Sequence, residues 1–525
     1  MFELSRSRSQ IFYSCWTQSR SKFQTQSISH NTQFSSSPST LNNDVLSIIY
    51  KEESNIGNFP VKRHETNEYY KSNIFTSFPQ FSRPTSSIKI PKKVWRALRY
   101  IPVRYLKAIH PDINAAREFC LLFLRNFNST YYKLINDTGY DGWEPLQAKY
   151  LREFYSNASL TYKNIRTALE YPLKGGSMLE CNYEYIKGQT SYKYRLGLNY
   201  RGKGIVEHEL KSQDAINLLV KNNERIYTNA IENPVCRNLF HFYSKITLPT
   251  IEEIHVEARR LINLKFHTKK GKRLAYLNKH NRLDFKGDNI SYVEDAIKLY
   301  DSLTDGGLMI PVPGSDKSGG RVVDSLTLMP GWIRALIKIG GEYLVECDYS
   351  CLHPNIVSAN YGGTQGWITH SSIASDFGLD EKDVKKEHLS FFNKRADQMK
   401  KSELYKYYSI HQPQIIKNVI SEKYQTEYGH KITSRMMFKK EVKIMTDVII
   451  QLNKEGIYTG YVYDALLCHP DHTKRVIEIM NHMVQSNGVK TLAKSASRSL
   501  KKTIKMKNYI HGKQREQFMD TSQKV

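Results

Sequence analysis

Apolar side chains recur at the spacing of an α-helix in four stretches of the chain, residues 94–106, 113–127, 251–264 and 438–452. In the last stretch the apolar positions advance alternately by four and three residues, which places them on one face of a helix. Each such face must pack against another element to leave water. The pattern therefore predicts a folded protein that is rich in amphipathic helices.

Two other stretches follow the pattern of β-strands, and each presents a carboxylate where a strand ends. Leu344 and Val345 begin a β-prone run that reaches Asp348, directly before a segment of helical character. Residues 458–470 form two β-prone arms with Asp464 at the tip between them. A helical, lysine-rich insertion separates the two stretches. This combination predicts an α+β fold with both aspartates at a sheet edge, and a helix cap is the alternative role for Asp348.

Residues 156–200 combine a helix pattern with a hairpin pattern. The predicted helix is followed by Pro and Gly, and two β-prone segments then flank a turn that contains glycine. Lys187, Lys193, Arg195 and several tyrosines decorate this hairpin. The arrangement resembles a winged helix, in which the helix enters a DNA groove and the hairpin touches phosphate. A solvated hairpin on a helical domain is the other interpretation.

The length and composition fit a globular protein of two or three domains. The chain has 525 residues, of which 40% are hydrophobic. No apolar run approaches the roughly 20 residues that cross a bilayer, so we expect no membrane partner. The seven cysteines are irregularly spaced and form no Cys-x-x-Cys pair. Neither a zinc site nor a disulfide framework is indicated.

The charge of the chain predicts a polyanionic partner. Lysine and arginine number 77 against 51 acidic residues, which gives a net charge of +26. The chain also contains 35 tyrosines and 21 phenylalanines. Cations neutralise phosphates, and aromatic rings stack on unpaired bases. Composition therefore favours nucleic-acid binding.

Residues 1–90 have the composition of a low-complexity tail, because Ser, Gln, Asn and Thr dominate and apolar positions lack a period. The first 40 residues are basic and serine-rich with a single acid. Organellar transit peptides have the same composition. We therefore expect a mitochondrial location in a eukaryote, or a cytoplasmic, nucleoid-associated one in a prokaryote or phage.

A two-metal phosphoryl-transfer site needs two carboxylate ligands, and the chain is expected to present two at sheet edges. Asp348 and Asp464 would hold two Mg²⁺ ions, or Mn²⁺ in their place. Magnesium takes substrate phosphates among its ligands, so few protein ligands suffice. Basic residues of the insertion between them would bind a triphosphate.

Three segments resemble motifs of the family A DNA polymerases. Residues 348–350 (Asp-Tyr-Ser), followed by a helix, resemble the first catalytic motif of that family. Helix 438–452 leading to residues 462–465 (Val-Tyr-Asp-Ala) resembles its last motif. Residues 320–325 (Gly-Arg-Val-Val-Asp-Ser) resemble its segment that contacts template and primer. The resemblance covers residues 305–475.

The resemblance implies a right-hand architecture with an antiparallel palm sheet, helical fingers and a helical thumb. It also implies DNA template, primer and nucleoside triphosphates as partners. The expected parts are a tail (1–90), a helical N-terminal and thumb region (91–300), the palm (301–356 and 438–487), the fingers (357–437) and a basic C-terminal tail (488–525).

The resemblance also assigns site residues. Asp348, Asp464 and the backbone carbonyl of Tyr349 become the metal ligands. Arg321 and Arg334 become nucleic-acid contacts, beside Lys187, Lys193 and Arg195 of the hairpin.

The fingers of the family supply a lysine for the triphosphate and a ring that stacks on the incoming base. Lys386 is the best match for the lysine, with Lys382 and Lys385 as rivals. Phe391 and Phe392 match the ring.

The chain departs from the family at three positions. Tyr463 and Ala465 stand where the last motif usually has His and Glu, so only its aspartate is kept. His353 stands where the DNA polymerases have a Glu that helps to exclude ribose. A bulky side chain there favours deoxynucleotides. The N-terminal half also lacks an Asp-x-Glu segment, so we expect no proofreading exonuclease.

The sequence predicts template-directed DNA synthesis in replication, as by a self-contained enzyme of a phage, plasmid or other mobile element. A single-subunit RNA polymerase or primase, a non-catalytic nucleic-acid-binding protein and a two-metal nuclease are the alternatives.

Overall fold

The computed structural model describes residues 86–136, 140–155, 159–186, 191–268, 271–277, 289–304, 309–364, 366–426 and 429–495. The predicted N-terminal tail up to residue 85, Lys187 and the basic C-terminal tail from residue 496 lie outside these ranges. Within them, no helix combines the length and the apolar character that a membrane span requires.

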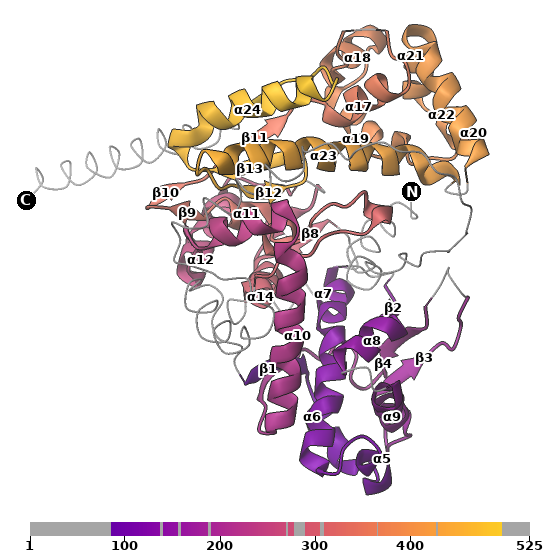
Figure 1. Ribbon diagram of the computed structural model, residues 1–525, viewed down its shortest axis with the longest axis vertical. Coiled ribbons are helices and arrows are strands. Elements are labelled where there is room, and N and C mark those ends of the chain that lie inside the picture. Colours follow the sequence, from indigo (N-terminus) through magenta and orange to yellow (C-terminus); the bar gives the residue numbers. More distant parts are fainter. Residues whose placement is uncertain are drawn as a thin grey trace, which may run out of the picture.

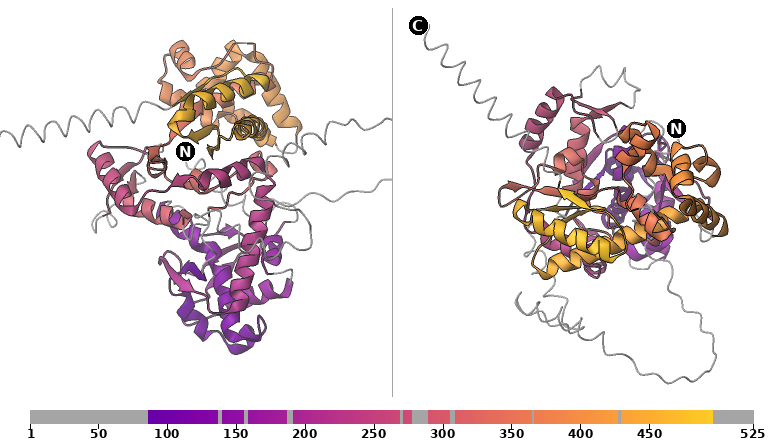
Figure 2. Two further views of the ribbon diagram at one scale, coloured as in Figure 1. Left: turned by 60° about the vertical axis from the view of Figure 1, so that its left-hand side comes forward. Right: turned by 90° about the horizontal axis from the view of Figure 1, so that it is seen from above.

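The chain builds two hydrophobic cores, which define an N-lobe and a C-lobe (Figures 1 and 2). The helix α10 (Gln213–Ile231) connects them. Its Leu218 and Leu219 belong to the first core, and its Ala230 belongs to the second. The boundary between the cores therefore falls within the range predicted as one N-terminal and thumb region.

The N-lobe is mainly helical and carries two small sheets, of order β1-β5 and β2-β4-β3. Its elements are β1 (Ser87–Pro91), α4 (Val94–Ala97), α5 (Val103–Lys107), α6 (Ile113–Leu124), α7 (Asn128–Asn136), β2 (Glu144–Pro145), α8 (Ala148–Phe154), α9 (Ser159–Glu170), β3 (Leu179–Cys181), β4 (Lys193–Leu196) and β5 (Ile205–Glu209).

The predicted hairpin of residues 156–200 is present as the antiparallel pair β3–β4, and α9 precedes it. Its strands are shorter than the sequence pattern suggested, and β2 joins them as a third strand. The turn of the hairpin lies outside the described residues. Tyr183 and Tyr185 beyond β3 are exposed.

The C-lobe begins with α11 and ends with the strand β14. Its elements are α11 (Pro234–Tyr243), β6 (Ile246–Thr247), α12 (Ile251–Asn263), β7 (Arg273–Ala275), β8 (Ile290–Tyr292), α14 (Val293–Thr304), α15 (Ser325–Leu328), α16 (Gly331–Arg334), β9 (Lys338–Ile339), β10 (Glu342–Tyr343), β11 (Val345–Tyr349), α17 (Leu352–Asn360), α18 (His370–Phe377), α19 (Glu381–Phe391), α20 (Ala396–Met399), α21 (Glu403–His411), α22 (Pro413–Gln425), α23 (Ile432–Lys454), β12 (Gly460–Val462), β13 (Ala465–Cys468), α24 (Thr473–Ser486) and β14 (Ala493–Ser495).

The central element of the C-lobe is an antiparallel four-stranded sheet of order β12-β13-β11-β14. Alternate residues of β11, such as Cys347 and Tyr349, are buried. The Tyr349 hydroxyl donates to the carbonyl of Met480 at 2.7 Å, which fixes α24 to this face. The other β11 positions, including Asp348, remain partly exposed. Accessibility is therefore local to the position of Asp348, because all four residues of the neighbouring strand β13 are buried.

The insertion between β11 and β12 contains helices α17 to α23; α17 to α22 lie at the upper right in Figure 1, and α23 runs from there across the picture below α24. The amphipathic helix predicted for residues 438–452 lies within α23 and buries Met445, Ile449 and Leu452. The structure is thus mixed helix and strand with small antiparallel sheets, as an α+β fold requires.

Candidate active site

Strand β11 places Asp348 in the middle of the four-stranded sheet. Asp348 lies opposite Ala465 of β13 on one side and opposite Lys494 of β14 on the other. Residues that lie directly opposite in antiparallel strands project from the same face, with Cβ atoms about 5 Å apart. Lys494 therefore projects from the same face as Asp348. This places a cation beside the first carboxylate.

The turn between β12 and β13 consists of Tyr463 and Asp464. Asp464 is thus the chain neighbour of Ala465, the residue that pairs with Asp348. Asp348 is on β11 and Asp464 is in the turn before the paired strand β13, although the two are more than a hundred residues apart in the chain. The register brings the second carboxylate to the edge of the sheet at which the first one lies.

The backbone departs from ordinary conformations next to both aspartates. Tyr463 has a φ angle of 62°, and Cys351, three residues after Asp348, has a φ angle of 55°. A positive φ is uncommon for residues other than glycine and costs about 1–3 kcal/mol. Contacts of the surrounding fold must hold both turns in place. Such strain is typical of functional sites.

A buried ionic network lies beside Asp464. Glu441 of α23 is fully buried. It accepts hydrogen bonds from the Arg321 guanidinium, with Nε at 2.7 Å, and contacts the His353 ring at Nε2. Arg321 Nη2 lies 3.1 Å from the same ring nitrogen. The network joins three segments that are far apart in the chain.

Two aromatic rings hold the guanidinium of Arg321 in this network. Its central carbon lies 3.6 Å from the centroid of Phe438 and 4.9 Å from the centroid of Tyr463. Cation–π contacts of this kind are worth about 2 kcal/mol when they are desolvated. Tyr463 directly precedes Asp464, so the stacking also anchors the turn that carries the second carboxylate.

The network sets the charges around the site. Burial by itself raises the pKa of Glu441, but Arg321 and His353 outweigh burial and lower it to about 2. Burial and the Glu441 charge raise the pKa of Asp464, against the opposing effects of His353 and Arg321. Added positive charge near Asp464 would oppose this rise in its pKa.

The three candidate lysines of the predicted fingers, Lys382, Lys385 and Lys386, are exposed on α19. Burial and, to a smaller extent, the charge of Lys385 lower the pKa of His370 to about 4. Burial raises the pKa of the Cys351 thiol, and the charge of Lys385 opposes this rise. Of the three lysines, Lys385 is the one whose charge acts on both His370 and Cys351.

The Cys351 thiol lies 3.2 Å from His370 Nδ1, which links the start of α17 to the start of α18. Lys494 also acts on the Cys351 thiol, because its charge lowers the pKa. The side of the sheet that carries Asp348 therefore has a cation on β14 and another on α19.

Two other predictions for the fingers need correction. Phe391 and Phe392 are 0% and 1% exposed. Both pack against Tyr408, with ring centroids 5.6 Å and 5.5 Å away. Rings that are enclosed in a helical core cannot stack on an incoming base. Sequence alone did not separate a buried aromatic pair from an exposed one.

The predicted nucleic-acid contacts are placed in different environments. Arg334 is buried and donates to the Leu326 carbonyl at 2.8 Å, so it holds α16 to α15 and does not suit a phosphate contact. Arg195 pairs with Glu180 at 2.6 Å and stacks over Trp143. Lys193 is exposed.

The residues that the structure brings together fit a divalent cation. Asp348 of β11 and Asp464 of the β12–β13 turn both offer carboxylate oxygens, which are ligands that magnesium prefers. Within the described ranges, no group of three or more His, Cys, Asp and Glu side chains is arranged around a metal position. Two carboxylates meet the needs of magnesium only when substrate phosphates complete its shell. Tyr349 offers its carbonyl next to Asp348.

Sequence reasoning missed Glu441 and Lys494. The position of Glu441 on the buried side of helix 438–452 was a signal, because an acid there must be paired. No sequence pattern indicated that its partner would be Arg321, which lies 120 residues away.

Comparisons with known proteins give little further information. The chain matches no protein-family model and no curated protein. Among solved structures it matches the POL domain of Pol1 from M. smegmatis in complex with DNA primer-template and dNTP, at a TM-score of 0.32 and 13% identity, over 54% of this chain and 72% of that chain. A similarity of this size does not carry an argument about function, so the proposal below is built on the site.

Proposed function

We propose that the protein is a nucleotidyltransferase that extends a DNA primer along a template, without proofreading. One observation carries the proposal. The strand register places Asp348 and Asp464 at one sheet edge, next to a buried Arg–Glu–His network and below a helical insertion with exposed lysines. In this reading the sheet is the palm, the insertion forms the fingers, and helices N-terminal to the sheet form the thumb of a right hand.

In the reaction, the primer 3′-oxygen forms a bond to the α-phosphorus of the nucleotide, and the bond to the β-phosphate breaks. The hydroxyl proton passes to a water molecule, and pyrophosphate departs with the electron pair of the broken P–O bond. Asp348, Asp464 and the Tyr349 carbonyl would hold divalent cations, which would supply positive charge to offset the negative charge that develops in this step.

The remaining residues bind and orient. Lys385 of α19 and Lys494, which pairs with Asp348 across β11 and β14, supply positive charge for the triphosphate. Arg321 cannot neutralise phosphate freely, because its guanidinium is already committed to Glu441. We assign it a positioning role: it stacks on Tyr463 and keeps the Asp464 turn in place.

His353 lies five residues after Asp348 and is the second residue of α17. Its ring is held by Glu441 and lies 5.8 Å from the Phe438 ring. A fixed, bulky ring at this position suits the exclusion of a ribose 2′-hydroxyl. This supports deoxynucleotides as the substrate, with a single-subunit RNA polymerase or primase as the alternative.

Primer extension tests the proposal. A labelled primer annealed to a longer DNA template is incubated with the protein, Mg²⁺, and dNTPs, rNTPs or no nucleotide. We expect elongation with dNTPs. Elongation with rNTPs alone would support the RNA polymerase, and shortening would identify a nuclease. Binding without any change in primer length would leave only a nucleic-acid-binding protein.

A further inference from the structure

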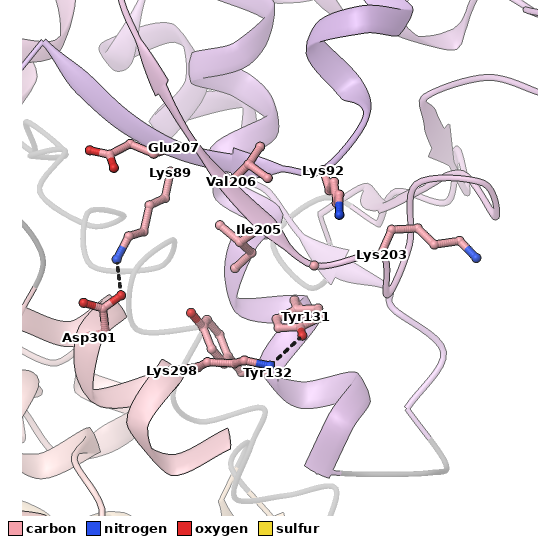
Figure 3. Close-up of a pocket in the computed structure, with 11 residues that line it drawn as sticks. Lys89, Lys92, Tyr131, Tyr132, Lys203, Ile205, Val206, Glu207, Lys298 and Asp301 are labelled. Atoms are coloured by element: carbon pink, nitrogen blue, oxygen red, sulfur yellow. Dashed lines mark hydrogen bonds and ion pairs between the residues drawn. The ribbon is translucent and has the colours of Figure 1, made fainter. Parts of the chain in front are cut away.

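A pocket of about 270 Å³ lies where the two lobes meet, away from the four-stranded sheet (Figure 3). The N-lobe contributes β1, α7 and the start of β5 to its walls, and the C-lobe contributes α14. Four lysines line it: Lys89, Lys92, Lys203 and Lys298. We name it the interlobe pocket.

The carboxylates of the interlobe pocket are already engaged. Asp301 pairs with Lys89 at 2.6 Å, and Glu207 accepts a hydrogen bond from the Ser87 hydroxyl. These two carboxylates face four lysines, so the pocket carries an excess of two positive charges. Among the described residues, neither Lys92 nor Lys203 forms an ion pair. An anion would meet cations whose charge is not balanced by the protein.

The geometry concentrates part of this charge near an aromatic wall. Lys298 Nζ lies 3.5 Å from the Tyr131 hydroxyl, and Lys92 is directed to the same side of the pocket (Figure 3). Tyr131 and Tyr132 pack edge to face, with ring centroids 5.4 Å apart. Lys203 lies toward the edge of the pocket in Figure 3. A phosphate near Lys92 and Lys298 would have the tyrosine rings beside it.

The backbone holds the two sides of the pocket at a fixed spacing. Lys92 N–H donates to the carbonyl of Gly204 at 2.9 Å, just beyond the β1–β5 pair. The ion pair between Lys89 and Asp301 joins β1 of the N-lobe to α14 of the C-lobe. The lysines of the interlobe pocket therefore lie where elements of the two lobes are connected to each other.

We propose that the interlobe pocket binds the phosphate groups of a nucleic-acid strand and gives the protein a second nucleic-acid contact, distinct from the sheet. Its volume is about that of one nucleotide, which is too small for a folded partner. Lysines for the phosphates and tyrosines for a base are the elements of a single-strand site. The inference deepens the proposed function and rests on it for its role: the N-lobe would hold the strand while the sheet carries out the chemistry.

The test measures the dissociation constant of a fluorescent single-stranded oligonucleotide by anisotropy at several salt concentrations. Metal and nucleotide are omitted, so the result does not depend on whether the protein synthesises DNA. The variant is Lys92→Gln/Lys298→Gln. The matched control, Lys107→Gln/Lys163→Gln, removes the same charge from exposed positions on α5 and α9, at the far end of the N-lobe in Figure 1.

We expect the pocket variant to raise the dissociation constant about ten-fold at 0.1 M salt and to lower the salt slope by about 1.4, since each lost phosphate contact on a single strand removes about 0.7. The control should change both quantities much less. Lys92→Arg/Lys298→Arg keeps both positive charges and should bind the oligonucleotide like the native protein. This result would show that the glutamine variant loses affinity because of charge and not because of misfolding. Equal effects of the pocket variant and the control would overturn the proposal.

A competition arm identifies the source of the phosphate. The proposal expects that neither inorganic phosphate nor a deoxynucleoside monophosphate, at 1 mM by design, displaces the oligonucleotide. A mononucleotide that binds the native protein but not the pocket variant, with oligonucleotide affinity unchanged, would contradict it. If primer extension fails but the pocket variant loses affinity as expected, the proposed function falls and the binding site stands.

Discussion

The sheet edge and the interlobe pocket use charge in opposite ways. At the sheet, Arg321, Glu441 and His353 are mutually paired, and Glu441 is fully buried. In the pocket, Lys92 and Lys203 are exposed and have no carboxylate partner among the described residues. Buried ion pairs fix the geometry of a site, because removing one partner leaves the other charge unpaired and away from water. Exposed cations give affinity and leave the fold unchanged. Each prediction below breaks or sharpens this contrast, from the largest expected effect to the smallest.

Asp348→Asn and Asp464→Asn should have the largest effect. Each should reduce primer extension by about a thousand-fold or more, because the amide that replaces the carboxylate carries no negative charge to bind the cation. Affinity for primer–template should change less than about two-fold, because neither carboxylate attracts a polyanion. An active Asp464→Asn protein would remove this residue from the site.

Glu441→Gln should be the most destabilising change in the network. It leaves the Arg321 guanidinium without an anion, which costs about 3–5 kcal/mol of unfolding free energy. Urea denaturation measures the loss. The control Glu403→Gln removes an exposed ion-pair partner of Lys406 and should cost less than about 1 kcal/mol. Comparable losses in the two variants would show that the buried network does not stabilise the fold.

The same network should make stability depend on acidity. The pKa of Glu441 is about 2 in the folded protein, below the ordinary value of 4.5. Between these values the unfolded chain binds more protons, so the contribution of Glu441 is complete above pH 4.5 and is lost as the pH falls toward 2. The loss amounts to roughly 3 kcal/mol. We expect the native protein to lose this stability as the pH falls and Glu441→Gln not to lose it. Parallel stability profiles of the two proteins would refute the assignment.

Lys385→Gln should weaken nucleotide binding by a smaller factor. We expect the KM for dNTP to rise about ten-fold, since one charge-assisted phosphate contact is worth roughly 1.5 kcal/mol. Lys382→Gln, on the same exposed helix, is the control and should change KM little. A larger effect of Lys386→Gln would return the role to the residue that the sequence favoured.

His353→Gly should have the smallest effect, a change in sugar preference of a few-fold in favour of ribonucleotides. The measurement is the ratio of kcat/KM for rNTP and dNTP within one variant, so that any loss of stability cancels. An unchanged ratio would mean that the ring only completes the network around Glu441.

Short-range patterns in the sequence predicted the elements that follow from spacing. The helix over residues 438–452 is confirmed within α23, because a continuous apolar face specifies the type of element, although α23 extends beyond the predicted range at both ends. The carboxylates of Asp348 and Asp464 could be singled out by their position at the ends of β-prone runs. Their common location could not, because the register between β11 and β13 is set by packing across more than a hundred residues.

Burial was the property that the sequence did not reveal. Phe391, Phe392 and Arg334 are residue types that nucleic-acid sites use, yet each of these side chains is buried. Glu441 was not singled out from the sequence, although its carboxylate contacts both Arg321 and His353. In each case a contact with a distant segment decides the environment, and single-sequence periodicity carries no record of that contact.

The central claim is that Asp348 and Asp464 share divalent cations. Electron paramagnetic resonance can count bound Mn²⁺ in the complex of the native protein with primer–template and a non-hydrolysable dNTP analogue. We predict two bound ions, with weaker binding in both Asp348→Asn and Asp464→Asn. Mn²⁺ binding that is unchanged in Asp464→Asn would contradict the claim.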